Sequence, residues 1–425
     1  MKLSLENVGK FKKANIEING ITVIAGANNT GKSTLGKTLY CIFTAMNDIE
    51  NKCKNEKVRF IQNEIAKFIS EIKSGSDDDF FRALWNRDSY IDINNLDEPN
   101  YVDVIIDKIV SKYKNVDKSK LLVLQEDLRH VFAFDISNFA GFVLEDYIND
   151  EFKNQFTNVK HRKSFIRFEV AKKEYEIKVE SGVPKIKNLF HSFSEAIYID
   201  NPFVIDGRND FLIHMRDRFL RDSFMHQERL YRLFHNSFKA NDKFSEILYD
   251  EKSKNVIEKI SMAAKGTIVE NSSEKMFLET GYKKPFHLKN LSSGLKTFVI
   301  FKQLLENRSI NDGDVLILDE PEIHLHPEWQ LLLAEIVVIL QKEFGLHVLL
   351  TTHSPYFINA IEVFSAKYKI ADKTKYYLTD INKEQYAFIE DVTTNTNKIY
   401  YLLAEPLKRL AVYDLNDSAI NKVVD

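Results

Sequence analysis

The start of the chain places apolar residues in a pattern that predicts several strands and then a helix. Lys2–Val8 and Ala14–Ile18 alternate between apolar and polar positions, as half-buried strands do. Ile21–Ala25 is an apolar run, which predicts a strand inside a sheet. Lys32–Phe43 has helical spacing. The pattern therefore predicts a strand–loop–helix unit around residue 26.

The next part of the chain is predicted to be helical. From about Met46 to Arg129 apolar residues recur at helical spacing, broken by polar loops at residues 74–79 and 92–100. Helical spacing returns over Arg216–Ala263. No heptad repeat is sustained, so long coiled-coil arms are not expected.

Strand patterns occupy much of the remainder. Ser164–Val170 and Tyr175–Val179 predict an antiparallel pair, and Ala196–Ile199 predicts a buried strand. Lys275–Thr280 and Pro285–Leu288 predict a hairpin over the Gly281-Tyr282 turn. Later predicted elements are a helix at Leu295–Leu305, strands at Val315–Leu318, Leu346–Leu350, Lys367–Leu378 and Gln385–Ile389, and a helix at Asn397–Leu410.

Composition is that of an ordinary globular protein. The 425 residues are 44% hydrophobic and 28% charged, with a net charge of −3. No basic field can cover the whole surface, so any nucleic-acid contact would be a local patch or belong to a partner. Cys41 and Cys53 are too few for a disulfide framework. No apolar run is long enough for a membrane span, and no secretory leader is recognisable, so we expect a cytoplasmic protein without membrane contact.

A glycine-rich loop joins the third predicted strand to the first predicted helix. Gly26–Ser33 matches the phosphate-binding pattern G-x-x-x-x-G-K-[ST]. Lys32 would reach the β- and γ-phosphates of ATP, and Ser33 would bind Mg²⁺. The alternative is a glycine-rich loop with a coincidental Lys-Ser. The predicted nucleotide-binding residues are Gly26, Asn28, Asn29, Thr30, Gly31, Lys32, Ser33 and Thr34.

Two adjacent carboxylates follow the apolar strand at Val315–Leu318. Asp319 at its carboxyl end could hold a water on Mg²⁺. Because strand side chains alternate, Glu320 would point elsewhere and could act as the general base that accepts a proton from the attacking water. The alternative is a solvated acidic turn.

Two further segments carry candidate chemistry. Ser292, Ser293 and Gly294 open a predicted helix, where hydroxyl and N–H groups can bind an anion; a plain serine cap is the alternative. His353 follows an apolar strand and could contact the γ-phosphate and orient water. His324 and His326 compete for that role or for a metal, but no third ligand is suitably spaced, and we favour a loop at a subunit contact.

The four motifs together resemble an ABC-type ATPase head of the SMC/RecF/OLD branch, a group of AAA-like ATPases found in bacterial anti-phage systems. The motifs that carry the resemblance are Gly26–Ser33, Leu291–Lys296, Leu318–Glu322 with His324–Pro327, and Thr352–Pro355. The resemblance implies an α/β P-loop NTPase of ABC/SMC type, with a two-lobed head, a mixed sheet and a helical insertion.

The resemblance also implies a dimer. Two heads would sandwich two ATP molecules, each held by one subunit's P-loop and by Ser292–Gly294 of the other, which would contact the γ-phosphate in trans. The chain departs from the family in having Ser293 and Leu295 where Gly and Gln or Glu are usual. The family's Mg²⁺-linked Gln has no clear counterpart, and Tyr198–Pro202 is the candidate region.

The expected organisation follows from these motifs. Residues 1–45 would form the N-terminal part of the head and 264–425 its C-terminal part. Between them we expect a helical insertion at 46–133, a lobe continuation with antiparallel strands at 134–215, and a helical segment at 216–263. OLD-type proteins carry a Toprim nuclease with a set of acidic residues. No such acidic set is recognisable after Pro355, and we interpret Asp77–Asp79 as charged residues exposed to solvent.

We therefore expect an ATPase, converting ATP and water to ADP and phosphate. It would act as a homodimer or higher homo-oligomer that controls a separate nuclease or toxin in anti-phage defence, as the ATPase subunits of Septu, PARIS and RloA-type systems do. One alternative is a RecF/SMC-like ATPase of DNA repair or DNA ends that contacts DNA directly. Another is a nucleotide-gated scaffold with negligible hydrolysis.

Overall fold

A computed structural model describes the chain except for several short segments. The described residues are 1–72, 95–96, 98, 100–113, 116–192, 194–206, 225–235, 242–271, 274–406 and 409–410. They form two compact units, one of residues 1–45, 144–184 and 194–425 and the other of residues 46–143 and 185–193. The predicted loop at 74–79, with Asp77–Asp79, lies outside the described residues, as does most of the predicted loop at 92–100.

A mixed sheet organises the first unit. Within the described residues it has 11 strands in the order β6-β5-β4-β1-β2-β14-β13-β3-β12-β11-β7. The strands are β1 (Lys2–Val8), β2 (Phe11–Glu17), β3 (Ile21–Gly26), β4 (Lys163–Val170), β5 (Lys173–Glu180), β6 (Val183–Ile186), β7 (Ala196–Ile199), β11 (Val315–Asp319), β12 (His347–Thr352), β13 (Thr374–Ile381) and β14 (Ala387–Asp391).

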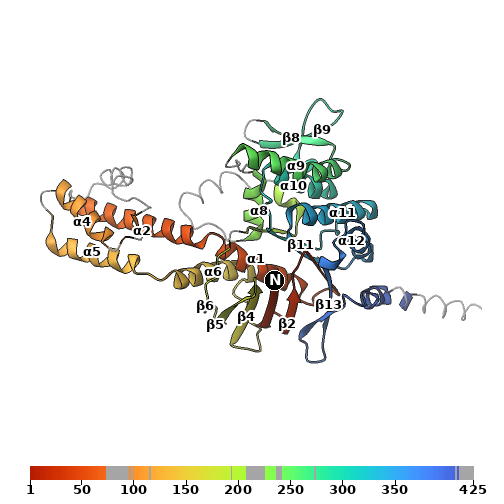
Figure 1. Cartoon of the computed structure of the whole chain (residues 1–425), viewed down its shortest axis with the longest axis horizontal. Coiled ribbons are helices and arrows are strands. Elements are labelled where there is room, and N and C mark those ends of the chain that lie inside the picture. Colours follow the sequence, from red (N-terminus) through yellow and green to blue (C-terminus); the bar gives the residue numbers. More distant parts are fainter. Residues whose placement is uncertain are drawn as a thin grey trace, which may run out of the picture. The chain divides into compact units, whose positions relative to one another are not determined.

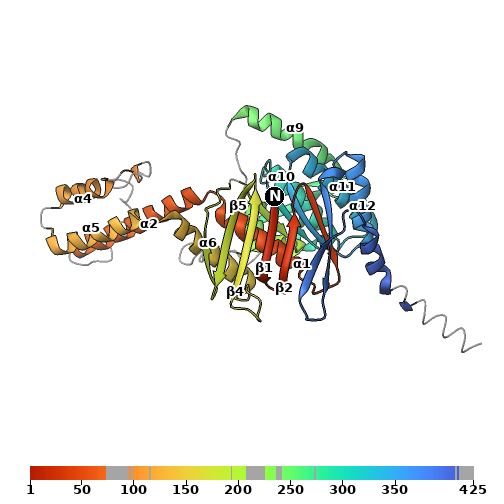
Figure 2. The same cartoon turned by 60° about the horizontal axis from the view of Figure 1, so that its bottom comes forward.

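The two halves of this sheet differ in direction and burial. β13, β3, β12, β11 and β7 run parallel, and every residue of β3 and β7 is buried. The pairs β1–β2, β1–β4 and β4–β5 are antiparallel, and Figure 2 shows these four strands side by side. Buried residues alternate along β1 because only one face of an antiparallel sheet needs to be covered.

Helices cover both faces of the parallel strands (Figure 1). Leu316 and Leu318 of β11 belong to a core shared with several helices, whereas Ile317 between them faces α1, where a Cβ on Gly36 would lie 3.0 Å from its methyl group. The helices are α1 (Lys32–Met46), α8 (His226–His235), α9 (Lys243–Ile260), α10 (Ser293–Glu306), α11 (Pro327–Phe344) and α12 (Pro355–Lys367). A further helix, α6 (Ile136–Phe152), carries residues of both units.

The second unit is mainly helical in the described part. Its helices are α2 (Ile49–Ile72), α4 (Tyr101–Lys112) and α5 (Lys118–Phe132), which Figure 1 shows in orange. They share an apolar core of their own, with Ile65 from α2, Ile105 from α4 and Leu128 from α5 at its centre. The helical pattern read from the sequence is therefore confirmed for these residues.

Three elements differ from the sequence-based expectation. The predicted hairpin is present as β9 (Glu274–Glu279) and β10 (Phe286–His287), but β8 (Gly266–Asn271) pairs with β9 and was not predicted. The strand predicted over Lys367–Leu378 was placed too early, because α12 continues to Lys367 and β13 begins only at Thr374. β2 begins at Phe11, three residues before the predicted start. The predicted C-terminal helix, in contrast, is present over the described residues 397–406.

No helix in the described ranges is both long enough and apolar enough to cross a membrane.

Candidate nucleotide-binding site

The loop between β3 and α1 depends on two glycines. A Cβ on Gly26 would lie 2.4 Å from the carbonyl oxygen of Thr379, and a Cβ on Gly31 would lie 2.8 Å from the ring of Phe11. Gly31 also has a φ of +89°, in the region that favours glycine. The loop therefore reaches this close-packed conformation only because both positions lack a side chain.

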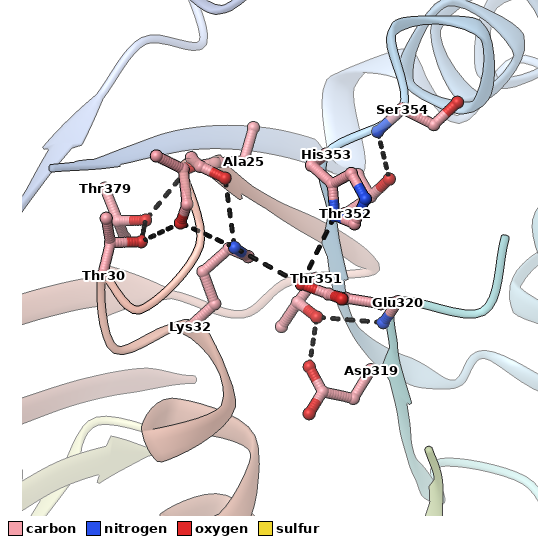
Figure 3. A network of polar contacts seen from close by, with 12 residues as sticks. Ala25, Thr30, Lys32, Asp319, Glu320, Thr351, Thr352, His353, Ser354 and Thr379 are labelled. Carbon is pink, nitrogen blue, oxygen red and sulfur yellow. Dashed lines mark hydrogen bonds and ion pairs between the residues drawn. The ribbon is translucent and has the colours of Figure 1, made fainter. Parts of the chain in front are cut away.

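Threonines brace the loop from β13. The Thr30 hydroxyl lies 2.8 Å from the carbonyl oxygen of Ala27 and 2.7 Å from the Thr379 hydroxyl, and its single proton can be donated to either. Thr379 also donates to the carbonyl of Ala25 at 3.2 Å (Figure 3). No pattern in the sequence pointed to Thr379, because it lies far along the chain and contacts the loop only through the β13–β3 pairing.

Lys32 is a buried cation inside this loop. Its side chain is 4% exposed, and its Nζ donates to the carbonyls of Gly26 at 3.0 Å and Ala27 at 2.9 Å. The same Nζ lies 3.4 Å from Oε1 of Glu320 (Figure 3). The P-loop and the carboxylate after β11 are therefore in direct contact, as a shared phosphate site requires.

Asp319 is held by two hydroxyl groups. Tyr198 of β7 donates to Oδ2 at 2.9 Å, and Thr351 of β12 donates to Oδ1. Each carboxylate oxygen can accept a further bond, so both remain able to hold a metal-bound water. Ser33, at the start of α1, is the second residue expected at a magnesium ion. One carboxylate and one hydroxyl fit Mg²⁺, which keeps several waters and otherwise binds substrate phosphates.

Glu320 does not continue the strand alternation that the sequence suggested. β11 ends at Asp319, and Glu320 has a φ of +51°, a left-handed conformation that costs a non-glycine residue about 1–3 kcal/mol. Its N–H donates to the carbonyl of Thr351 at 3.0 Å and to the hydroxyl of the same residue at 3.1 Å. This turn, and not the period of a strand, directs the Glu320 side chain away from Asp319 and towards Lys32.

His353 faces the same carboxylate. Its Nδ1 lies 3.4 Å from Oε1 of Glu320, and its side chain is 41% exposed. Glu322, which belongs to the Leu318–Glu322 motif but was assigned no role from the sequence, is 4% exposed. It accepts the N–H of His353 at 3.0 Å and the hydroxyl of Thr352. Burial raises the pKa of the Glu322 carboxyl, against the opposing effect of these donors. Glu322 thereby fixes the backbone that presents His353.

A cavity of about 630 Å³ opens beside these groups, a size within the range of small-molecule sites. Its walls come from the P-loop and the first turns of α1, from the turn at Gly9 and Lys10, and from residues 151–160. Asn29, Gly31, Lys32, Ser33 and Thr34 line it, and so does Glu320. A cation, a helix N-terminus and a cavity of this size together suit a nucleoside triphosphate.

Comparison with known proteins agrees with this geometry. A family described as "AAA domain, putative AbiEii toxin, Type IV TA system" has a model that matches residues 21–359. The chain belongs to this family. As an AAA-domain protein with a mixed sheet and a P-loop, it has the predicted fold class at the level of an α/β P-loop NTPase.

A curated relative of this AAA-domain protein is the "Retron Vc95 probable ATPase" of Vibrio cholerae serotype O1 biovar El Tor. The two are 25% identical over 389 residues, which cover 88% of this chain and 64% of the relative. The chain thus spans less than two thirds of that relative's length.

Solved structures with a similar arrangement include SMC heads. The SMC head domain from Thermotoga maritima is 13% identical, covering 92% of this chain and 98% of that one, with a TM-score of 0.38. An SmcHead bound to the C-winged helix domain of ScpA is 11% identical, covering 93% and 98%, with a TM-score of 0.43.

The Ser292–Gly294 segment of this AAA-domain protein is not among the described residues that line the cavity. Ser292 caps α10, its hydroxyl accepting the N–H of Leu295 at 3.3 Å. Ser292 is exposed and Ser293 half-buried, whereas a Cβ on Gly294 would lie 3.1 Å from both the His324 carbonyl and the Trp329 ring. The two serines are therefore the accessible part of this motif.

His324 and His326 lie in the loop between β11 and α11, not on a strand. The ring of His324 packs edge-on against Phe203 at 5.4 Å, and Nδ1 of His326 accepts the N–H of Glu328 at 3.4 Å, capping α11. Both side chains are exposed. Their local contacts agree with a role in shaping this loop.

Replacing Lys32 tests the binding site. Lys32→Ala removes the only P-loop ammonium group, and two or more charge-assisted hydrogen bonds to phosphate are worth enough to weaken ATP binding on the order of 10²-fold. Titration of a fluorescent ATP analogue measures the change. Lys13→Ala removes an exposed cation of β2 that does not line the cavity, and it is expected to change affinity much less. Equal effects of the two variants would contradict a specific role for Lys32.

Proposed function

We propose that this chain binds ATP with Mg²⁺ and hydrolyses it to ADP and phosphate. The observation that supports the proposal best is the position of Glu320, whose Oε1 lies 3.4 Å from both Lys32 Nζ and His353 Nδ1. A carboxylate placed between a phosphate-binding cation and an imidazole is suited to accept a proton from water beside the γ-phosphate.

Each group would have a separate task. Lys32 would exchange its contacts with the P-loop carbonyls and Glu320 for phosphate oxygens, releasing Glu320 to act as the base. His353 would orient the attacking water and contact the γ-phosphate. Ser33 and Asp319 would hold Mg²⁺, which neutralises charge on the phosphates.

We further propose that two copies of the chain close around nucleotide. The exposed Ser292 and half-buried Ser293 stand at the N-terminus of α10, where N–H groups and the helix dipole favour an anion. Neither serine is among the described residues that line the chain's own cavity. The phosphate that they would contact would therefore belong to a nucleotide bound by a second copy.

The physiological role we propose is control of a separate nuclease or toxin in anti-phage defence. The family description names a toxin–antitoxin system, and the curated relative is named for a retron. Nucleotide-driven closure would then set the state of the effector. A direct role at DNA remains the second reading, and salt-dependent DNA binding by the purified protein would favour it.

Replacing Glu320 tests hydrolysis. Glu320→Gln removes the base but keeps Lys32, Ser33 and Asp319, so ATP binding should persist while turnover falls about 10²–10⁴-fold. The variant should accumulate as an ATP-bound dimer, measured by phosphate release and by size-exclusion chromatography with ATP. Glu328→Gln, at an exposed position of α11, is the matched control. Turnover by Glu320→Gln at the wild-type rate would exclude Glu320 as the base.

Mixing two inactive variants tests the composite site. Ser293→Asp places a negative charge against the partner's phosphate, yet an acidic residue in the first turn favours α10 itself. Lys32→Ala and Ser293→Asp should each be inactive alone. In a mixed dimer one site carries both defects and the other is intact, so ATPase activity, or at least ATP-dependent pairing, should return.

The neutral variant Ser293→Asn is the control and should remain active alone. If mixing restores neither activity nor pairing, although both proteins are folded and exchange partners, the site is formed within one chain.

A further inference from the structure

A buried tyrosine contacts the carboxylate that we assign to Mg²⁺. Tyr198 lies on β7, paired in parallel with Ile317 of the neighbouring β11, and is 1% exposed. Its hydroxyl donates to Oδ2 of Asp319 at 2.9 Å.

The tyrosine ring is held on two sides. The His226 ring of α8 stacks on it with centroids 4.3 Å apart and planes at 24°, and the Tyr40 ring of α1 lies 6.1 Å away. The helix α1 packs beside the hydroxyl, since a Cβ placed on Gly36 would lie in van der Waals contact with the Tyr198 hydroxyl oxygen, at 3.5 Å. A ring packed in this way has little freedom to swing its hydroxyl away from Asp319.

His226 is itself fixed by two carboxylates. Its Nδ1 lies 2.8 Å from Glu151 of α6, and its Nε2 lies 2.9 Å from Oδ2 of Asp200, two residues after Tyr198. The Glu151 carboxylate also accepts the backbone N–H of His226 at 2.6 Å. Burial alone would lower the pKa of His226, but the two carboxylates outweigh it and raise the pKa to about 9. An imidazolium paired on both sides is a rigid support for the stacked ring.

We propose that Tyr198 is a positioning residue that sets the orientation of the Asp319 carboxylate for Mg²⁺, with the paired His226 holding the tyrosine in place. The inference rests on the proposed binding of Mg²⁺ and ATP. Tyr198 on one oxygen and Thr351 on the other fix the rotation of the carboxylate from both sides. Removing a group that hydrogen-bonds to a metal ligand typically lowers metal affinity about 10–100-fold.

Tyr198→Phe removes the hydroxyl and keeps the ring. The Mg²⁺ concentration that half-saturates ATP hydrolysis should rise about 10-fold or more. Mg²⁺ should still increase the affinity of the protein for a fluorescent ATP analogue, but the Mg²⁺ concentration needed should rise by the same factor. The affinity for the analogue in EDTA should stay unchanged. The rate at saturating Mg²⁺ should stay within a few-fold of wild type.

Tyr376→Phe is the matched control. Tyr376 lies on β13 of the same sheet and is buried, and its hydroxyl has no hydrogen-bond partner in the described part of the chain. This variant should leave the Mg²⁺ dependence as in wild type. Thermal denaturation of both variants separates an effect on folding from an effect on the metal.

The outcomes distinguish the inference from the function on which it rests. If Tyr198→Phe lowers the melting temperature but needs no more Mg²⁺ than Tyr376→Phe, the tyrosine is only structural and the proposal is wrong. If the wild-type protein binds the analogue in a Mg²⁺-dependent way but does not hydrolyse ATP, hydrolysis is wrong and the binding titration still decides the role of Tyr198. If the wild-type protein binds no nucleotide, both fail.

Discussion

The hydrogen-bond register between parallel strands determines which residues meet at the site. β3, β12, β11 and β7 are neighbours, and their carboxyl ends share one edge of the sheet. The ladder places Thr352 opposite Ala25, just before the P-loop, and Asp319 opposite Thr351. Segments far apart in sequence are thus brought into contact by backbone pairing. A slip of one residue in any of these ladders would turn the site's side chains to the other face.

Thr351 links the two acidic residues within that frame. Its hydroxyl donates to Asp319 and accepts the N–H of Glu320, so one side chain orients a carboxylate and stabilises the left-handed turn beside it. The Thr351 carbonyl accepts the same N–H. These bonds offset the backbone strain at Glu320, which would otherwise favour returning to an extended strand and pointing away from Lys32.

The parts of the site that could be predicted from the sequence are those whose chemistry requires particular residue types close together. The P-loop with Lys32 and the Asp319-Glu320 pair belong to this class, and the structure brings them into contact. The contacts of Thr379 and Tyr198 could not be predicted, because only long-range strand pairing gives a threonine or tyrosine its position. The sequence marked Tyr198–Pro202 only as the candidate region for a Gln linked to Mg²⁺. β8 was missed for a related reason: its partner β9, and not its own alternation, decides that it is a strand.

The segment after β7 connects the nucleotide site to the start of α10 within one chain. It forms the short helix η3 (Pro202–Asp206), whose Asp206 lies 2.5 Å from the ammonium of Lys296, and Lys296 is 1% exposed. Lys296 is buried, whereas Asp206 is partly exposed, so separating the pair would leave the lysine charge buried and uncompensated, which is unfavourable. The backbone segment that begins at Tyr198, next to Asp319, is therefore connected through the Asp206–Lys296 ion pair to α10. The first turn of α10 contains Ser293. If Asp319 holds Mg²⁺ and Ser292 and Ser293 meet a second copy, as we propose, coupling between the two would require no long pathway, because both depend on one stretch of backbone anchored at each end.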